Sequence, residues 1–190
     1  MVQPAPEQAT LARMATTLDD ARHVMSTTVA RWEQLLARVP AELIERRPLP
    51  GEWSAAECLQ HLMFTERHIF GVRLRALLAG QDLVPYDPDA PRDPEPEHTA
   101  PEQLAALAAL RADNARTLDR LTDADLARTA HHPEYGTVTL EMLVNVWAAH
   151  DLQHTVQAEH ALMQAFIPNT GHWRWEFAEQ DVEARAAARS

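Results

Sequence analysis

The sequence predicts an all-α fold: a four-helix bundle with a long crossover between its second and third helices, followed by a C-terminal tail. The chain is rich in Ala, Leu and Arg and has only five Gly and two Tyr, a composition that favours helix over sheet. Apolar residues recur at helical spacing along four long segments. An acidic, proline-rich stretch over 82–101 separates the second segment from the third, and such a long connection allows these two helices to run parallel.

Length and charge limit the classes of protein. At 190 residues the chain is expected to form one domain, with a bundle core at about 7–163 and a tail at 164–190. The formal charge of -11 argues against binding to nucleic acid or to an anionic membrane. The single cysteine, Cys58, excludes an internal disulfide, and no apolar run approaches the ~20 residues of a membrane span. Without a recognisable signal segment, the expected location is the cytoplasm.

The first two helices are marked by spacing and by punctuation. Apolar residues from about 7 to 39 predict one long amphipathic helix or two with a small break, and three prolines follow it. Ser54 and Glu57 form a capping-box pattern that starts the second helix, with Trp53 as the hydrophobic residue just outside the cap. Gly80 is the expected end of this helix.

The third and fourth helices have equally clear starts. Thr99 and Glu102 repeat the capping-box pattern, and the third helix is expected to run to about residue 121, followed by a short turn. Gly136 marks a turn, and Thr139 caps a fourth helix that reaches about residue 163. The tail breaks at a proline and a glycine, and its Trp-Arg-Trp cluster at 173–175 is expected to cover one end of the bundle.

Three histidines form the candidate functional site. His150 and His154 are four residues apart and therefore share one face of the fourth helix, as two ligands of one metal ion must. His61 lies on the apolar face of the second helix and would supply a third imidazole from a different helix. Three neutral imidazoles without a thiolate leave coordination positions open, which is typical of a catalytic metal site. The alternative interpretation is three unrelated core or surface histidines.

The residues around these histidines resemble a known family. GEWSAAECLQHL at 51–62 is similar to the "G-x-W-S-x-x-E-x-x-x-H-L" start of the second helix in the DinB/YfiT-like superfamily. HDLQHTVQ at 150–157 is similar to its "H-x-x-x-H-x-x-Q" motif, and GTVTL at 136–140 resembles the lead-in to that helix. The likeness extends from the first helix to about residue 163 and leaves out the proline-rich crossover and the tail after Pro168.

The resemblance implies a bundle that holds a divalent metal ion on His61, His150 and His154. The ion would be nickel, zinc, iron or manganese, and the resemblance does not select among them. Characterised relatives are thiol-dependent enzymes that transfer low-molecular-weight thiols to electrophiles or isomerise maleylpyruvate, whereas many members have no assigned reaction. A thiol cosubstrate, a small-molecule substrate and a homodimer are therefore expected.

Several other side chains are weaker candidates. Glu57 lies one turn before His61 and could orient its ring, although its role in the capping box is the better supported interpretation. His68, Trp147 and Gln157 lie near the expected cavity, with bundle core or solvated surface as the alternative for each. Arg174 in the tail is the one cation that the sequence offers for holding an anionic thiol.

Two functions from different classes remain open. The first is a metal-dependent thiol S-transferase, or a related hydrolase or isomerase. The second is a non-catalytic, stress-associated module in which the metal ion mainly ties two helices together. A plain helical interaction domain would require the match of all three histidines to be a coincidence. An open coordination position that solvent can reach would favour the enzyme.

Overall fold

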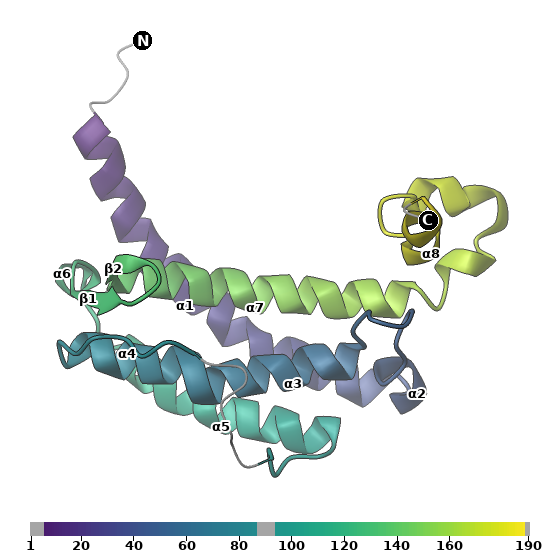
Figure 1. Cartoon of the computed structure of the whole chain (residues 1–190), viewed down its shortest axis with the longest axis horizontal. Coiled ribbons are helices and arrows are strands. Elements are labelled where there is room, and N and C mark those ends of the chain that lie inside the picture. The colour runs from purple at the N-terminus through teal and green to yellow at the C-terminus, as the bar shows by residue number, and fades with distance from the viewer. Residues whose placement is uncertain (1–5, 87–93, 189–190) are drawn as a thin grey trace.

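The chain folds into a bundle of four long helical segments (Figure 1), as the sequence predicts. The computed structural model describes residues 6–86 and 94–188, with side chains from Leu18 onward, so part of the predicted crossover lies outside the described residues. The four segments are α1 (Pro6–Arg38), a composite of α3 (Ala55–Thr65), the π-helix η1 (Glu66–Phe70) and α4 (Gly71–Leu78), then α5 (Ala100–Leu118) and α7 (Leu140–Met163). No helix in these ranges is long and apolar enough to cross a membrane.

The long crossover gives the bundle parallel neighbours. Helices α1 and α3 each pack against both α5 and α7. Leu107 of α5 packs in one cluster with Leu59 of α3, whereas Leu118 packs with Leu74 of α4, so α5 runs in the same direction as the α3–α4 segment. By the same pairing, α7 runs antiparallel to α3–α4 and parallel to α1, as Figure 1 shows.

The helix starts confirm the predicted capping boxes. The Ser54 hydroxyl accepts from the Glu57 backbone N–H at 3.2 Å, and the Glu57 carboxylate accepts from the Ser54 backbone N–H at 2.9 Å. Thr99 and Glu102 make the same reciprocal pair at the start of α5. The Thr139 hydroxyl accepts from a backbone N–H in the first turn of α7. The site-bearing helices α3 and α7 therefore begin where local sequence signals place them.

A small hairpin between α5 and α7 is absent from the sequence prediction. Strand β1 (Thr129–His132) pairs antiparallel with β2 (Gly136–Thr139). Two short helices also connect the long segments: α2 (Ala41–Ile44) precedes α3, and α6 (Asp123–Leu126) precedes the hairpin. The predicted turn at Gly136 is present, and this residue has a φ of +70°, which favours glycine. The Leu83 N–H donates to the His131 carbonyl at 2.8 Å, so the hairpin also holds the start of the crossover.

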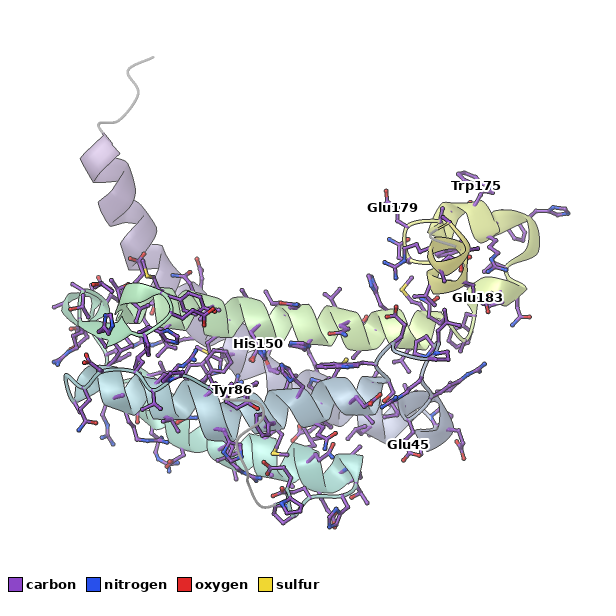
Figure 2. The ribbon with its side chains drawn as sticks, viewed as in Figure 1. Glu45, Tyr86, His150, Trp175, Glu179 and Glu183 are labelled. Atoms are coloured by element: carbon purple, nitrogen blue, oxygen red, sulfur yellow. The ribbon has the colours of Figure 1, made fainter. Side chains whose placement is uncertain are left out.

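The C-terminal tail does not cover the end of the bundle with its tryptophans. It forms η2 (Ile167–Asn169), η3 (Gly171–Phe177) and α8 (Val182–Ala187), which lie beside the end of α7 (Figure 1). Trp173 and Trp175 are 67% and 74% exposed, and Trp175 projects outward in Figure 2. The tail is anchored instead by Ile167 and Val182, both buried, so the predicted role of the Trp-Arg-Trp cluster is wrong.

The apolar core has two parts, and a buried polar layer lies between them. One part gathers around Trp147 and Phe70, and the other around Trp32 and Leu62. Along each long helical segment the polar residues fall between these two groups: Thr28, Glu66, Arg111, Asn114 and Asp151, all at most 5% exposed. The sequence analysis did not single out this layer.

Arg111 is the centre of the polar layer. Its guanidinium donates to both oxygens of Glu66 at 3.1 and 2.9 Å and to both oxygens of Asp151 at 2.6 and 3.0 Å. A further N–H reaches the Met25 carbonyl at 3.0 Å, so all five guanidinium donors have acceptors. Burial alone lowers the pKa of Arg111, but the two carboxylates outweigh it and raise that pKa. One side chain of α5 thereby binds η1, α7 and α1 together.

The close approach of η1–α4 to α5 depends on Gly71. A Cβ at this position would lie 2.7 Å from the Asn114 Oδ1 atom, and Asn114 donates to Glu66 at 2.9 Å. We expect Gly71→Ala to lower the free energy of unfolding by about 1–3 kcal/mol, because moving Asn114 leaves a buried carboxylate oxygen with one donor fewer. Chemical denaturation measures the change. In an Asn114→Ala background the same substitution should cost much less, and an equal cost in both backgrounds would contradict this interpretation.

Candidate metal centre

Three histidines from two antiparallel helices meet in the middle of the bundle. His61 is carried by α3, and His150 and His154 lie one turn apart on α7. One ring nitrogen from each lies within 4.8 Å of the others, and Figure 2 shows His150 where α7 faces α3. The ring centroids are 4.4 Å apart for both pairs that involve His154 and 5.1 Å for His61 and His150. The residues that the sequence analysis grouped are therefore neighbours in space.

The ring nitrogens are disposed as the ligands of one ion would be. The Nε2 atoms of His61 and His150 are 3.1 Å apart, and two nitrogens at about 2.0–2.1 Å from a common ion would lie about 2.9–3.4 Å apart. His154 Nδ1 lies 2.9 Å from Gln157 Oε1, so this nitrogen carries the proton and Nε2 keeps its lone pair. His150 Nδ1 is buried without a partner. These three residues fit a divalent metal ion, whose ligands must be unprotonated nitrogens.

Burial keeps the three imidazoles neutral. Desolvation, reinforced by His154, lowers the pKa of His61 to about 4. Desolvation, reinforced by the two other histidines and by Arg111, lowers the pKa of His150 to about 3. The pKa of His154 is also lowered, mainly by burial, although Gln157 and Asp151 oppose the shift. At neutral pH the site therefore offers lone pairs without first losing protons.

These shifts predict acid sensitivity of the metal-free protein. In the unfolded chain the imidazoles take up protons near pH 6.5, whereas in the folded chain His61 and His150 remain neutral until about 4 and about 3. Stability should be full above pH 6.5 and fall as the pH drops from 6.5 toward 4, by at most about 1.4 kcal/mol per pH unit for each imidazole. Urea denaturation from pH 7 to pH 4.5 measures this slope. His150→Asn should flatten it, whereas a variant of the exposed His160, His160→Asn, should not.

Two aromatic side chains enclose the histidines. Trp53 stacks on His154 with ring centroids 5.7 Å apart and tilts against His61 at 5.1 Å. Phe70 meets His150 edge to face at 5.1 Å and stacks on Trp147. The sequence pattern assigns Trp53 only to the helix cap and does not place Phe70. The tryptophan of the 51–62 motif was the signal that could have identified the first of them.

One side of the histidine cluster opens onto a cavity of about 340 Å³. Its lining includes Trp53, Gln60, His61, Phe64, Thr65, Ile69 and Tyr86. Glu57 and Glu95 also line it. A small molecule in this cavity would contact His61 directly, so the cluster is reachable through this one of its three histidines.

The structure separates the weaker candidates. Gln157 contacts the cluster through His154, as described above. Glu57 lines the cavity, but its carboxylate bonds the Ser54 backbone and Arg47, and no bond to His61 occurs among its described contacts. These bonds lower the pKa of Glu57 in spite of its partial burial. The interpretation of Glu57 as a capping residue therefore accounts for its contacts.

His68 and Trp147 lie outside the cluster. His68 lies inside the π-helix η1, whose turns hold more residues than those of an α-helix, so the regular spacing that predicted a shared face for His61 and His68 does not apply. His68 is exposed, its ring lies tilted against Phe64 with centroids 4.6 Å apart, and its Nε2 is 2.7 Å from a Glu95 carboxylate oxygen. Trp147 is fully buried in the core, where its Nε1–H donates to Glu66 at 3.0 Å.

Arg174 is not available to hold an anionic ligand at this site. Its guanidinium donates to Asp181 at 2.6 and 3.1 Å and to Glu183 at 2.9 Å. These carboxylates raise its pKa. The side chain therefore holds the tail together instead of acting at the histidine cluster.

Gln157 offers a test of how the cluster is oriented. Removing its carbonyl oxygen in Gln157→Leu frees the His154 ring to rotate, so we expect metal affinity to fall about 10–100-fold. Gln153→Leu is the matched control, because Gln153 lies on the same helix but is exposed. Competition with a chromophoric chelator gives both affinities. Equal affinity in the wild type and in Gln157→Leu would contradict the orienting role.

Comparison with known proteins agrees with the helical bundle. Residues 7–158 match the family model of the DinB superfamily, so the chain belongs to this superfamily. It is also similar in structure to YfiT from Bacillus subtilis, described as a probable metal-dependent hydrolase with an unusual four-helix bundle topology. That match has a TM-score of 0.65 and 19% sequence identity, and covers 87% of this chain and 91% of YfiT. No curated protein sequence matches the chain.

Proposed function

We propose that the protein is a metal-dependent enzyme of the thiol S-transferase type, in which His61, His150 and His154 hold a divalent ion. One observation carries the proposal: three neutral imidazoles converge, and one of them, His61, lines a cavity of about 340 Å³. A structural metal site is normally closed by four protein ligands, whereas three ligands leave a position for a substrate. A bound divalent ion would supply Lewis-acid chemistry that lowers the pKa of a thiol or a water molecule.

The lining of the cavity favours a thiol over water as the nucleophile. Both carboxylates on the wall are already engaged, Glu57 with Arg47 and Glu95 with Arg67 and His68. The described part of the cavity therefore has no unpaired carboxylate to act as a general base. A free thiol has a pKa near 8.5 and water about 15.7, so the thiol is the nucleophile that ionises more readily without such a base.

Aromatic residues of the cavity suit it to an apolar substrate. Trp53 stacks on His154, and Trp53, Phe64 and Tyr86 all line the cavity. These rings would exclude bulk water and pack against an apolar electrophile.

Hydrolysis is the second candidate function, because YfiT is described as a probable metal-dependent hydrolase. A non-catalytic metal-binding module remains the alternative from a different class.

A screen for conjugate formation distinguishes these functions. The purified protein, loaded in turn with nickel, zinc, iron or manganese, is incubated with a panel of electrophiles and several low-molecular-weight thiols, and products are identified by mass spectrometry. The proposal expects metal-dependent conjugates that are lost in His61→Ala and retained in His160→Ala. Hydrolysis of an ester or amide panel without conjugates would favour the hydrolase, and activity that survives metal removal would overturn both.

The expected assembly is a homodimer that acts on a small molecule. Met142, Val146 and Val156 are exposed on α7 at 56%, 51% and 53%, and they recur at helical spacing along one side of the helix. An apolar helix face of this kind supports self-association. Sedimentation equilibrium of the full chain tests whether it forms a dimer. We also propose that the protein is located in the cytoplasm.

A further inference from the structure

A larger cavity adjoins the one beside His61. It has a volume of about 820 Å³ and lies between α4 and the crossover segment at 81–86. Ile69 and Tyr86 line both cavities, so the two are neighbours along the same helical segment. The walls of the larger cavity are mainly apolar and include Val72, Ala76, Leu83, Val84 and Pro85. Its size is within the range of about 300–1,000 Å³ typical of small-molecule sites.

Arg73 is a cation in this wall that lacks an acceptor. It is partly buried, and its only polar contact among the described residues is with His132 Nε2 at 3.4 Å. Desolvation accordingly lowers the pKa of Arg73, although Tyr135 and Glu134 oppose the shift. The other arginine of the wall, Arg75, reaches Asn114 Oδ1 at 3.4 Å.

His132 does not serve as the missing acceptor. It is 3% exposed, and its Nδ1 accepts the backbone N–H groups of Glu134 at 3.2 Å and Tyr135 at 3.4 Å. A neutral ring that accepts at Nδ1 carries its proton on Nε2, so the Arg73 guanidinium and the His132 Nε2–H are two donors that face each other. Such a pair is unfavourable unless an acceptor lies between them.

We propose that the cavity between α4 and residues 81–86 binds an organic anion whose carboxylate or phosphate accepts hydrogen bonds from the Arg73 guanidinium. The apolar walls would hold the body of the ligand. Arg is the side chain best suited to bind a carboxylate or phosphate through two parallel hydrogen bonds. The charges of the lining also favour an anion, because the larger cavity has two arginines, Arg73 and Arg75, against one carboxylate, Asp82, whereas the smaller cavity has two carboxylates.

The position of this anion site suggests how a substrate is oriented relative to the histidine cluster. This inference about orientation rests on the proposed function. Along a regular helix the twelve residues from His61 to Arg73 would span about 18 Å. A ligand anchored at Arg73 would therefore extend past Ile69 toward His61. The thiol or the electrophile would be an elongated molecule with its anionic group at the end remote from the reacting atom.

Binding of small anions to the metal-free protein tests the site without reference to catalysis. Hexanoate, hexyl phosphate and 1-hexanol are titrated into the metal-free chain, and amide chemical shifts are followed by NMR. The proposal expects hexanoate or hexyl phosphate to shift Val72, Leu83 and Val84 and to bind at least tenfold more tightly than hexanol. The two anions distinguish a carboxylate site from a phosphate site. Equal binding of hexanol, or shifts confined to other regions, would overturn the proposal.

Substitution of Arg73 supplies an independent readout. Arg73→Gln should weaken binding of the preferred anion at least tenfold, whereas Arg38→Gln, which changes an exposed arginine of α1, should leave it unchanged. Because the guanidinium has no acceptor in the free protein, Arg73→Met should keep or raise the melting temperature. A large loss of stability in Arg73→Met, or unchanged anion binding in Arg73→Gln, would assign Arg73 to structure and contradict the proposal. Metal content is unaffected in either case, so this failure is distinct from failure of the proposed function.

Discussion

Replacing Arg111 with methionine is expected to lower the free energy of unfolding by about 3–5 kcal/mol. The substitution keeps much of the side-chain volume but removes the hydrogen bonds that the Arg111 guanidinium donates to Glu66 and Asp151. Two carboxylates, 1% exposed each, would remain with only Asn114 and Trp147 on one and Thr28 on the other. Leaving a buried charge without its partner costs far more than losing an exposed ion pair. Urea denaturation at pH 7 measures the loss.

The matched control for Arg111 lies on the same helix. Arg116 pairs with Asp113 at 2.5 Å, but both side chains are about two-thirds exposed. Arg116→Met should therefore change stability by less than about 1 kcal/mol. Replacing all three members of the buried network, in Glu66→Leu, Arg111→Met and Asp151→Leu together, should recover much of the loss, because no buried charge remains. A loss below about 1 kcal/mol in Arg111→Met would contradict the role assigned to the network.

The second large effect is stabilisation by a divalent ion. Binding that requires the folded arrangement of His61, His150 and His154 raises the free energy of unfolding by about 4 kcal/mol at a thousandfold excess over the dissociation constant. Differential scanning fluorimetry with zinc and with nickel should therefore show a melting temperature that rises with metal concentration. The rise should persist at pH 5 and weaken only as the pH approaches 4, because metal binding requires deprotonated rings and the pKa values of His61 and His150 in the folded chain are about 4 and about 3.

Single histidine variants separate this site from adventitious binding. His150→Ala should abolish the metal-dependent rise, whereas His160→Ala, at the exposed end of the same helix, should retain it. Because His150 lacks a protein partner at Nδ1, its replacement should disturb the metal-free fold little. A rise of the same size in His150→Ala and the wild type would show that the ion binds elsewhere.

Local signals in the sequence were sufficient for the helices and for the grouping of the histidines. The reciprocal bonds of Ser54 with Glu57 and of Thr99 with Glu102 involve residues three apart, so their sequence pattern determines them. The spacing of His150 and His154 likewise follows from the period of a helix. The long crossover correctly indicated that α5 would run parallel to the preceding segment.

The features that sequence reasoning missed depend on contacts between distant segments. Glu66 and Arg111 are 45 residues apart, and nothing local distinguishes them from solvated charges on a helix surface. The π-helix at 66–70 changes which residues share a face with His61, and it accompanies the inward placement of Glu66. The hairpin at 129–139 has strands of only four residues each, and the sequence pattern indicated a turn at Gly136 without the strands on either side of it. Tertiary packing, more than local propensity, determines each of these.

The most direct test of the central claim is the metal content of the native protein, measured by inductively coupled plasma mass spectrometry after purification without a histidine tag. The account predicts close to one divalent ion per chain in the wild type and nearly none in His61→Ala and His150→Ala, with both variants folded by circular dichroism. A wild-type protein that takes up no divalent ion, or variants that retain it at the same stoichiometry, would contradict the assignment of His61, His150 and His154 as a metal centre.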